Sequence, residues 1–137
     1  MRMHAPISGA RNYNAEVIYT RRALAKEPMA YRIGIDAGSK TLKLVVLDES
    51  GAVVYDTYMR HRANIARTLI EALHDFNWRH GAVQASVAMT GSGAIEVART
   101  LGIPFVQEVV ATTHAVRVQI PKANAVIELG GEDAKVI

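Results

Sequence analysis

Three short runs of mostly branched apolar residues follow one another between residues 33 and 59, and they constrain the fold more than any other feature. Ile33 to Asp36 and Leu42 to Asp48 are separated by a turn at Gly38. After a second turn at residues 48–51, the segment from Ala52 to Met59 alternates in polarity. Such runs are typical of strands, and short turns between them favour antiparallel pairing of neighbours. The sequence therefore predicts a three-stranded antiparallel meander.

Helical and strand patterns alternate after the meander. Apolar residues recur at helical spacing over residues 63–78, and polarity alternates strictly from Val83 to Met89. A second helix follows and is stopped by Gly102 and Pro104. The remaining expected elements are a short strand at 104–107, a helix at 109–118 and a buried strand at 123–129. This order predicts an α/β fold, an RNase H-like half-domain with a mixed sheet and flanking helices.

These expectations divide the chain into three parts. Residues 1–30 contain prolines, a glycine and scattered charge, which predicts a mobile basic leader. Residues 31–122 are expected to form the RNase H-like lobe. Residues 123–137 are expected to start a second lobe and to end before any partner strand appears. We therefore expect the sequence to be a fragment of a longer protein.

The composition fits a small globular domain whose folded part is neutral. Half of the 137 residues are apolar, which is enough for one core. Residues 1–30 hold five Lys or Arg against two Asp or Glu, and residues 31–137 hold eleven of each sign. Without a basic stripe on the folded part, the sequence argues against nucleic acid as a partner. Because the sequence also lacks cysteine and any apolar run of membrane-spanning length, we expect a cytoplasmic protein.

The turn between the first two strands carries residues that suit a phosphate group. Asp36 ends one strand, and Lys43 lies shortly after the bend. The residues predicted to contact nucleotide in this bend are Gly38, Ser39, Lys40 and Thr41. Amides and a hydroxyl can hold a terminal phosphate, lysine can neutralise it, and Asp36 can order a magnesium-bound water. An ordinary hairpin with surface charges is the alternative, and the Walker A spacing is absent.

A second glycine-rich turn occurs near the end of the sequence. Glu128 lies inside the apolar run that precedes it, where a carboxylate needs a partner or a cleft. The residues predicted to bind nucleotide here are Gly130, Gly131, Glu132, Asp133 and Lys135. A simple bend of the chain is the alternative for the double glycine. Together the two turns predict a split site in which both face one triphosphate.

Other polar residues receive structural interpretations. Ser92, in the turn at residues 90–93, is expected to cap the second helix, with anion binding by free amides as the alternative. Glu108 is expected to complement the dipole of the third helix. No metal-ligand spacing relates His61, His74 and His80. No serine or histidine motif supports nucleophilic catalysis.

Residues 31–137 resemble the BadF/BadG/BcrA/BcrD-type ATPases, which include activators of 2-hydroxyacyl-CoA dehydratases and benzoyl-CoA reductases. The resemblance rests on residues 34–39 with Lys43, on residues 90–93, on Glu108 followed by His114 and Ala115, and on residues 130–137. It implies the sugar kinase, Hsc70 and actin superfamily, in which two RNase H-like lobes close over Mg-ATP. Members of the family are homodimers that share a 4Fe-4S cluster, for which this sequence has no cysteine ligand.

The resemblance implies the N-terminal lobe of an ATP-hydrolysing activase that energises electron transfer to a CoA-dependent dehydratase or reductase. It assigns Asp36, Lys43 and Glu128 to catalysis, with Asp36 and Glu128 holding magnesium through water. Lys40, Glu128 and Glu132 depart from the family, which has a small hydroxyl residue, an aspartate and a glutamine at these positions. Two alternatives stay open: a small-molecule kinase of the same superfamily, and a degenerate lobe that serves as a protein-interaction module.

Overall fold

The computed structural model describes residues 30–129 and 134–137. Residues 1–29 of the predicted leader lie outside the described residues. So do four predicted site residues, Gly130, Gly131, Glu132 and Asp133.

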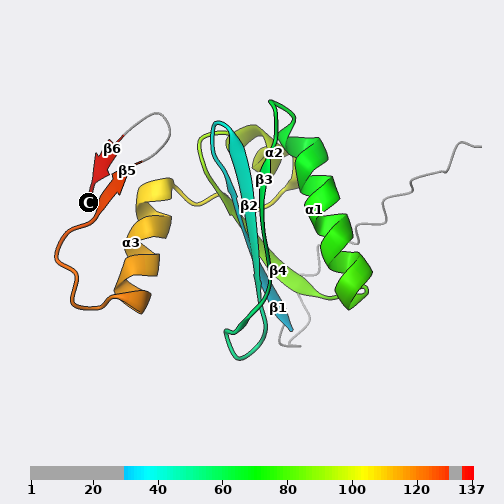
Figure 1. Ribbon diagram of the computed structural model, residues 1–137, viewed down its shortest axis with the longest axis horizontal. Helices are drawn as coiled ribbons and strands as arrows, with labels where there is room; N and C mark the ends of the chain where they lie inside the picture. The colour runs from blue at the N-terminus through cyan, green and yellow to red at the C-terminus, as the bar shows by residue number, and fades with distance from the viewer. Residues whose placement is uncertain (1–29, 130–133) are drawn as a thin grey trace, which may run out of the picture.

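The predicted meander is present and supplies most of the main sheet (Figure 1). β1 (Tyr31–Ala37), β2 (Thr41–Leu47) and β3 (Val53–Arg60) pair antiparallel in chain order. Alternate side chains of β1 and β2 are buried on one face: Ile33, Ile35, Ala37, Leu42, Leu44 and Val46. A slip of one residue would turn all of these side chains to the opposite face, so burial fixes the register.

The fourth strand, β4 (Ala85–Thr90), pairs parallel with β1 and gives the strand order β3-β2-β1-β4. The predicted short strand at 104–107 is wrong in extent, because the structure has only an isolated parallel bridge between Met89 and Phe105. The carbonyl of Pro104 and the N–H of Val106 bond to Met89 at 2.9 and 2.8 Å. Since proline has no N–H to donate, the ladder does not extend further in that direction.

The helix predicted for residues 63–78 is α1 (Ile65–His80), and it covers the buried face of the sheet. Asn64 caps it by accepting a hydrogen bond from the N–H of Arg67 at 3.1 Å. Leu69, Ala72 and Phe76 are buried against the sheet, and the Phe76 ring lies 5.4 Å from that of Tyr55. The apolar spacing read from the sequence is therefore the packing stripe of this helix.

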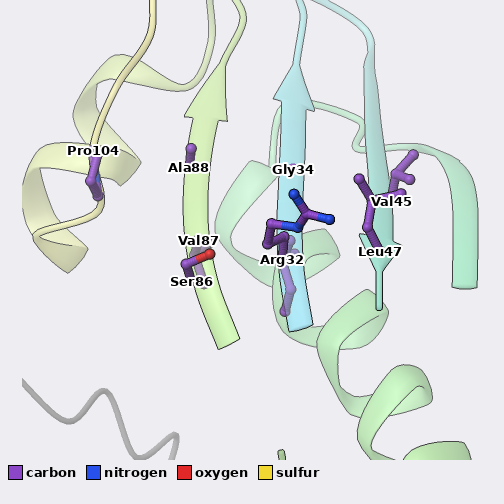
Figure 2. A pocket seen from close by; sticks show the side chains of 9 residues that line it. Arg32, Gly34, Val45, Leu47, Ser86, Val87, Ala88 and Pro104 are labelled. Atoms are coloured by element: carbon purple, nitrogen blue, oxygen red, sulfur yellow. The ribbon is translucent and has the colours of Figure 1, made fainter. Parts of the chain in front are cut away.

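The opposite face of the sheet carries an open apolar groove of about 410 Å³ (Figure 2). Small and apolar side chains from β1, β2 and β4 line most of it, and Arg32 extends over β1, between β4 and β2. The lining residues are Arg32, Ile33, Gly34, Val45, Leu47, Ser86, Val87, Ala88 and Pro104. Of the predicted site residues that the structure describes, none lines this groove.

The remaining elements are α2 (Ile95–Leu101), α3 (Glu108–Gln119), β5 (Ile127–Leu129) and β6 (Ala134–Val136). In Figure 1, α3 and the β5–β6 hairpin lie on one side of the main sheet and α1 lies on the other. α3 buries none of its residues completely. Within the described residues, no helix is long and apolar enough to cross a lipid bilayer.

Two expectations about the end of the chain are wrong. The strand predicted as buried over residues 123–129 is only β5, in which Ile127 and Leu129 are 70% and 80% exposed. A partner strand is present as well, since β6 pairs antiparallel with β5. A connection of four residues is long enough to join two hairpin strands, so no longer sequence is needed for pairing. The apolar residues of β5 signal strand formation without signalling burial.

Candidate functional site

Asp36 and Lys43 form an ion pair at one end of the main sheet. They are directly opposite each other in the antiparallel β1–β2 register, on the face away from α1. The Lys43 Nζ atom lies 2.7 Å from Oδ2 of Asp36, with side-chain exposures of 47% and 34%. The hairpin therefore gathers these two predicted residues without any distant contact.

The pKa of Lys43 is raised above its ordinary value of 10.5, first because its ammonium group donates a hydrogen bond to Asp36. Partial burial acts in the opposite direction, and the charges of Asp36, Tyr58 and Glu128 raise the pKa further. Lys43 therefore carries its charge at neutral pH.

The β1–β2 turn presents its residues to solvent. The N–H of Gly38 donates to the carbonyl of Thr41 at 3.0 Å, and Ser39 and Lys40 are exposed at the tip. A Cβ on Gly38 would meet only the Thr41 carbonyl oxygen, at an ordinary 3.8 Å. Packing therefore does not explain this glycine, and its bare backbone leaves room for a ligand to approach closely.

His61 forms hydrogen bonds to the same turn. It is 5% exposed, and its Nδ1 accepts a hydrogen bond from the N–H of Ala63 at 3.1 Å. The ring proton is therefore on Nε2, which donates to the carbonyl of Gly38 at 3.0 Å. The N–H of His61 also donates to the carbonyl of Lys40 at 3.2 Å. Sequence patterns assigned no role to His61. In the structure, His61 links the β1–β2 turn to the residues just before α1.

The turn at residues 90–93 packs closely on the end of β1. Gly91 has a φ of 104°, and a Cβ there would lie 2.3 Å from the carbonyl oxygen of Ala37 and 2.7 Å from Oδ1 of Asp36. The N–H of Gly93 donates to the same carbonyl of Ala37 at 2.9 Å. Thr90 lies beside Asp36 in the parallel β1–β4 register. Glycine is therefore required here by both conformation and space.

Ser92 does not cap α2, so that interpretation is wrong. The residue at the cap position is Ala94, and no side chain bonds to the first turn of the helix. Instead, the N–H of Ser92 donates to Oε1 of Glu108 at 3.0 Å. The turn at residues 90–93 runs on through Ala94 before α2 begins, which places Ser92 too far from the helix to cap it.

Glu108 does more than complement the dipole of α3. It lies in the first turn of α3, as expected, but its carboxylate also accepts from Ser92 and pairs with Lys135 of β6. Lys135 is in turn opposite Glu128 in the β5–β6 register. The predicted residues Lys135 and Glu128 are thus brought to the same side of the sheet as the turn at residues 90–93.

Two buried oxygens in this region lack a hydrogen-bond partner within residues 30–129 and 134–137: Oγ1 of Thr90 and Oε2 of Glu128. A buried polar atom without a partner is costly, and a water bound to a cation would satisfy it. Among the described residues, no three Asp, Glu, His or Cys side chains cluster to hold a metal ion by themselves. Magnesium retains several waters and uses one or two carboxylates together with phosphates. Asp36 and Glu128 with Thr90 fit that mode of binding.

Sequence patterns could not identify three of the residues in this region. His61 carries no motif of its own. Thr90 and Glu108 belong to motifs on which the family resemblance rests, but those motifs assigned neither side chain to the site. The available signals were the polar Thr90 at the end of an apolar strand and the acidic Glu108 before a helical segment. Neither signal names a partner, because the contacts join segments that are distant in sequence.

No protein-family model matches the sequence, and no curated protein matches it. Solved structures do match. An activator of 2-hydroxyisocaproyl-CoA dehydratase from Clostridium difficile, with bound ADPNP, is 24% identical with a TM-score of 0.62. The alignment covers 77% of this chain and 40% of that one. Component A of (R)-2-hydroxyglutaryl-CoA dehydratase from Acidaminococcus fermentans is 23% identical with a TM-score of 0.63, over 78% and 42% of the two chains.

The ethanolamine utilization protein EutJ from Carboxydothermus hydrogenoformans is also similar, with 19% identity, a TM-score of 0.59 and coverage of 85% of this chain and 50% of that one. These likenesses establish the fold, which is that of the actin-like, RNase H-like ATPases. The predicted fold class is confirmed. The chain spans about two fifths of the length of the two dehydratase proteins.

Proposed function

We propose that this chain is the phosphate-binding lobe of an ATP-binding activase of the dehydratase-activator kind. The observation that supports the proposal is a chain of contacts that links two separate segments at one end of the sheet. Asp36 and Lys43 pair on β1 and β2. Lys135, opposite Glu128 in the hairpin, pairs with Glu108, which accepts from Ser92 in the turn that packs on β1. A paired acid and base beside a bare glycine turn suits the terminal phosphates of a nucleotide.

Each residue has a role that follows from its chemistry. Lys43 supplies positive charge to a terminal phosphate, and the exposed turn at Gly38–Thr41 supplies amides and hydroxyl groups. Asp36 and Glu128 would hold magnesium through water, which neutralises phosphate charge when it is bound. Gly130 to Asp133 and Lys135 complete the second phosphate turn. The lobe holds the phosphates while a second lobe, which begins at residue 123, closes over the nucleotide and excludes water.

The activase role is supported by the likeness to the two dehydratase proteins and by the sequence motifs at residues 34–43, 90–93 and 130–137. One of those structures holds ADPNP, and both belong to CoA dehydratase systems by their descriptions. In the whole protein, a homodimer with a 4Fe-4S cluster would couple ATP hydrolysis to electron delivery to a CoA-dependent dehydratase or reductase. The present residues would contribute nucleotide binding and no cluster ligand, since the sequence has no cysteine.

Nuclear magnetic resonance of the ¹⁵N-labelled chain titrated with Mg-ADP tests the proposal. We expect the amides of Gly38, Ser39, Lys40 and Thr41 to shift, and Lys43→Ala to weaken the titration by about tenfold or more. Arg67→Ala is the matched control, because Arg67 pairs only with Glu71 on the exposed side of α1 within the described residues. Unchanged amide positions at saturating Mg-ADP would remove nucleotide binding as the function.

A further inference from the structure

The β5–β6 hairpin is too small to hold its own position. Each strand has three residues, and one further backbone pair joins Val126 and Ile137. A two-stranded hairpin is marginally stable by itself in water. Burial does not anchor it either, because Ile127, Leu129 and Val136 are all at least 70% exposed. Some other contact must keep it beside the main sheet.

Glu108 is well placed to provide that contact. The backbone just before it is tied to β4, since Pro104 and Val106 both bond to Met89. One carboxylate oxygen of Glu108 accepts from the Ser92 N–H, and the other pairs with the ammonium group of Lys135. The side chains of Glu108 and Lys135 are 31% and 24% exposed. This pair is therefore more shielded from solvent than the other ion pairs of the described residues.

We infer that Glu108 is a positioning residue that fixes the β5–β6 hairpin against the turn at residues 90–93, and so brings Glu128 and Lys135 to the phosphate site. The role of this contact in binding phosphate rests on the proposed function. The contact itself, which joins Ser92, Glu108 and Lys135 and which we call the tether, is a property of the fold. Glu108 acts through Lys135 and Ser92 and does not contact the nucleotide. Its carboxylate links the turn at residues 90–93 to Lys135 of the hairpin.

Two variants break the link, and a third restores only its ion pair. Glu108→Gln keeps an oxygen for the Ser92 N–H but cannot form an ion pair with an ammonium group, and Lys135→Glu places two carboxylates together. The double variant Glu108→Lys with Lys135→Glu restores an ion pair of reversed polarity, but an ammonium group at residue 108 cannot accept from the Ser92 N–H. Glu96→Gln is the control, because Glu96 pairs with Arg99 on an exposed face of α2.

Hydrogen exchange at the amides of Val126 and Ile137 reports the tether directly. We expect exchange about fivefold faster in each single variant, and only partly restored protection in the charge-swapped one, which recovers the ion pair without the bond from Ser92. Exchange that matches Glu96→Gln in both single variants would overturn the inference.

Nucleotide binding is measured on the same samples. Loss of the tether should weaken the Mg-ADP titration of the Gly38–Thr41 amides, and the charge swap should not restore it, because the ammonium group then belongs to residue 108. If the hairpin loosens while Mg-ADP affinity stays unchanged, Glu108 does not position the site and the inference fails. If the unaltered chain binds no Mg-ADP, the proposed function fails, and hydrogen exchange at Val126 and Ile137 still decides whether Glu108 holds the hairpin.

Discussion

Lys43 donates a 2.7 Å hydrogen bond to Asp36 from the directly opposite position of the neighbouring strand. Because the two residues belong to adjacent strands of one hairpin, their separation is set by the sheet ladder. The pair therefore forms as soon as the hairpin does. It presents a carboxylate and an ammonium group together at the edge where the β1–β2 turn begins.

Replacing Asp36 by asparagine should lower the pKa of Lys43 toward its ordinary value of 10.5, because the principal hydrogen bond and the nearest negative charge are weakened together. A titration of the lysine side chain by nuclear magnetic resonance measures this change. The raised pKa in the folded state means that the pair stabilises the fold fully below pH 10.5 and less as the pH rises through the folded value. At neutral pH, Asp36→Asn should cost within about 1 kcal/mol, because both side chains are partly exposed.

Glu128→Gln should lower the pKa of Lys43 by a smaller amount than Asp36→Asn does. Glu128 acts on Lys43 through its charge alone, and it is the last of the contributions in order of size. The same side-chain titration tests this ordering. Glu49→Gln is the control, since Glu49 lies in the turn after β2, outside the groups that shift Lys43. If the Lys43 pKa is the same in Glu128→Gln and in Glu49→Gln, β5 does not belong to the proposed phosphate site.

The meander and α1 could be predicted because their signals are local. Ile33, Ile35, Leu42 and Leu44 alternate with exposed residues on the strands, and one apolar stripe defines the helix. The same locality explains why Asp36 and Lys43 lie together, since only a short turn separates their strands. Patterns of burial in contiguous segments are thus readable without knowing the rest of the structure.

The connections among Ser92, Glu108 and Lys135 could not be predicted, because each joins segments that are far apart in the chain. Serine is a preferred residue at helix N-caps, so local propensity favoured a cap at Ser92. The partner of its N–H is instead the carboxylate of Glu108, which lies 16 residues further along the chain. Ile127 and Leu129 are apolar and predicted a buried strand, but exposure depends on what packs against a strand and not on its own sequence. Long-range partners are the information that single-sequence reasoning lacks.

Gly91→Ala should destabilise the fold strongly. The left-handed φ of 104° is unfavourable for alanine, and its Cβ would collide with the Ala37 carbonyl at 2.3 Å, so we expect a loss of about 3 kcal/mol or more. Gly102→Ala is the matched control, because its φ is 65° and nothing lies within 4 Å of the added Cβ. That variant should lose about 1 kcal/mol. Urea unfolding measures both, and equal losses would contradict the close packing of the turn at residues 90–93 on β1.

His61→Ala should destabilise the β1–β2 turn as well as the whole fold. The variant removes the side-chain donor to the Gly38 carbonyl and the acceptor for the Ala63 N–H, and it leaves a cavity where a buried ring had been. We expect a loss of about 1–3 kcal/mol in the free energy of unfolding, because buried polar groups lose their partners. His114→Ala is the control, since His114 is exposed on α3.

The two variants should also differ in the local behaviour of the turn. In His61→Ala, the amides of Gly38 to Thr41 should exchange faster than in His114→Ala, under conditions where both proteins remain folded. A purely global effect would instead accelerate exchange in β1 and β2 to the same extent. If the turn amides and the strand amides change together, His61 stabilises the core and does not hold the β1–β2 turn in place.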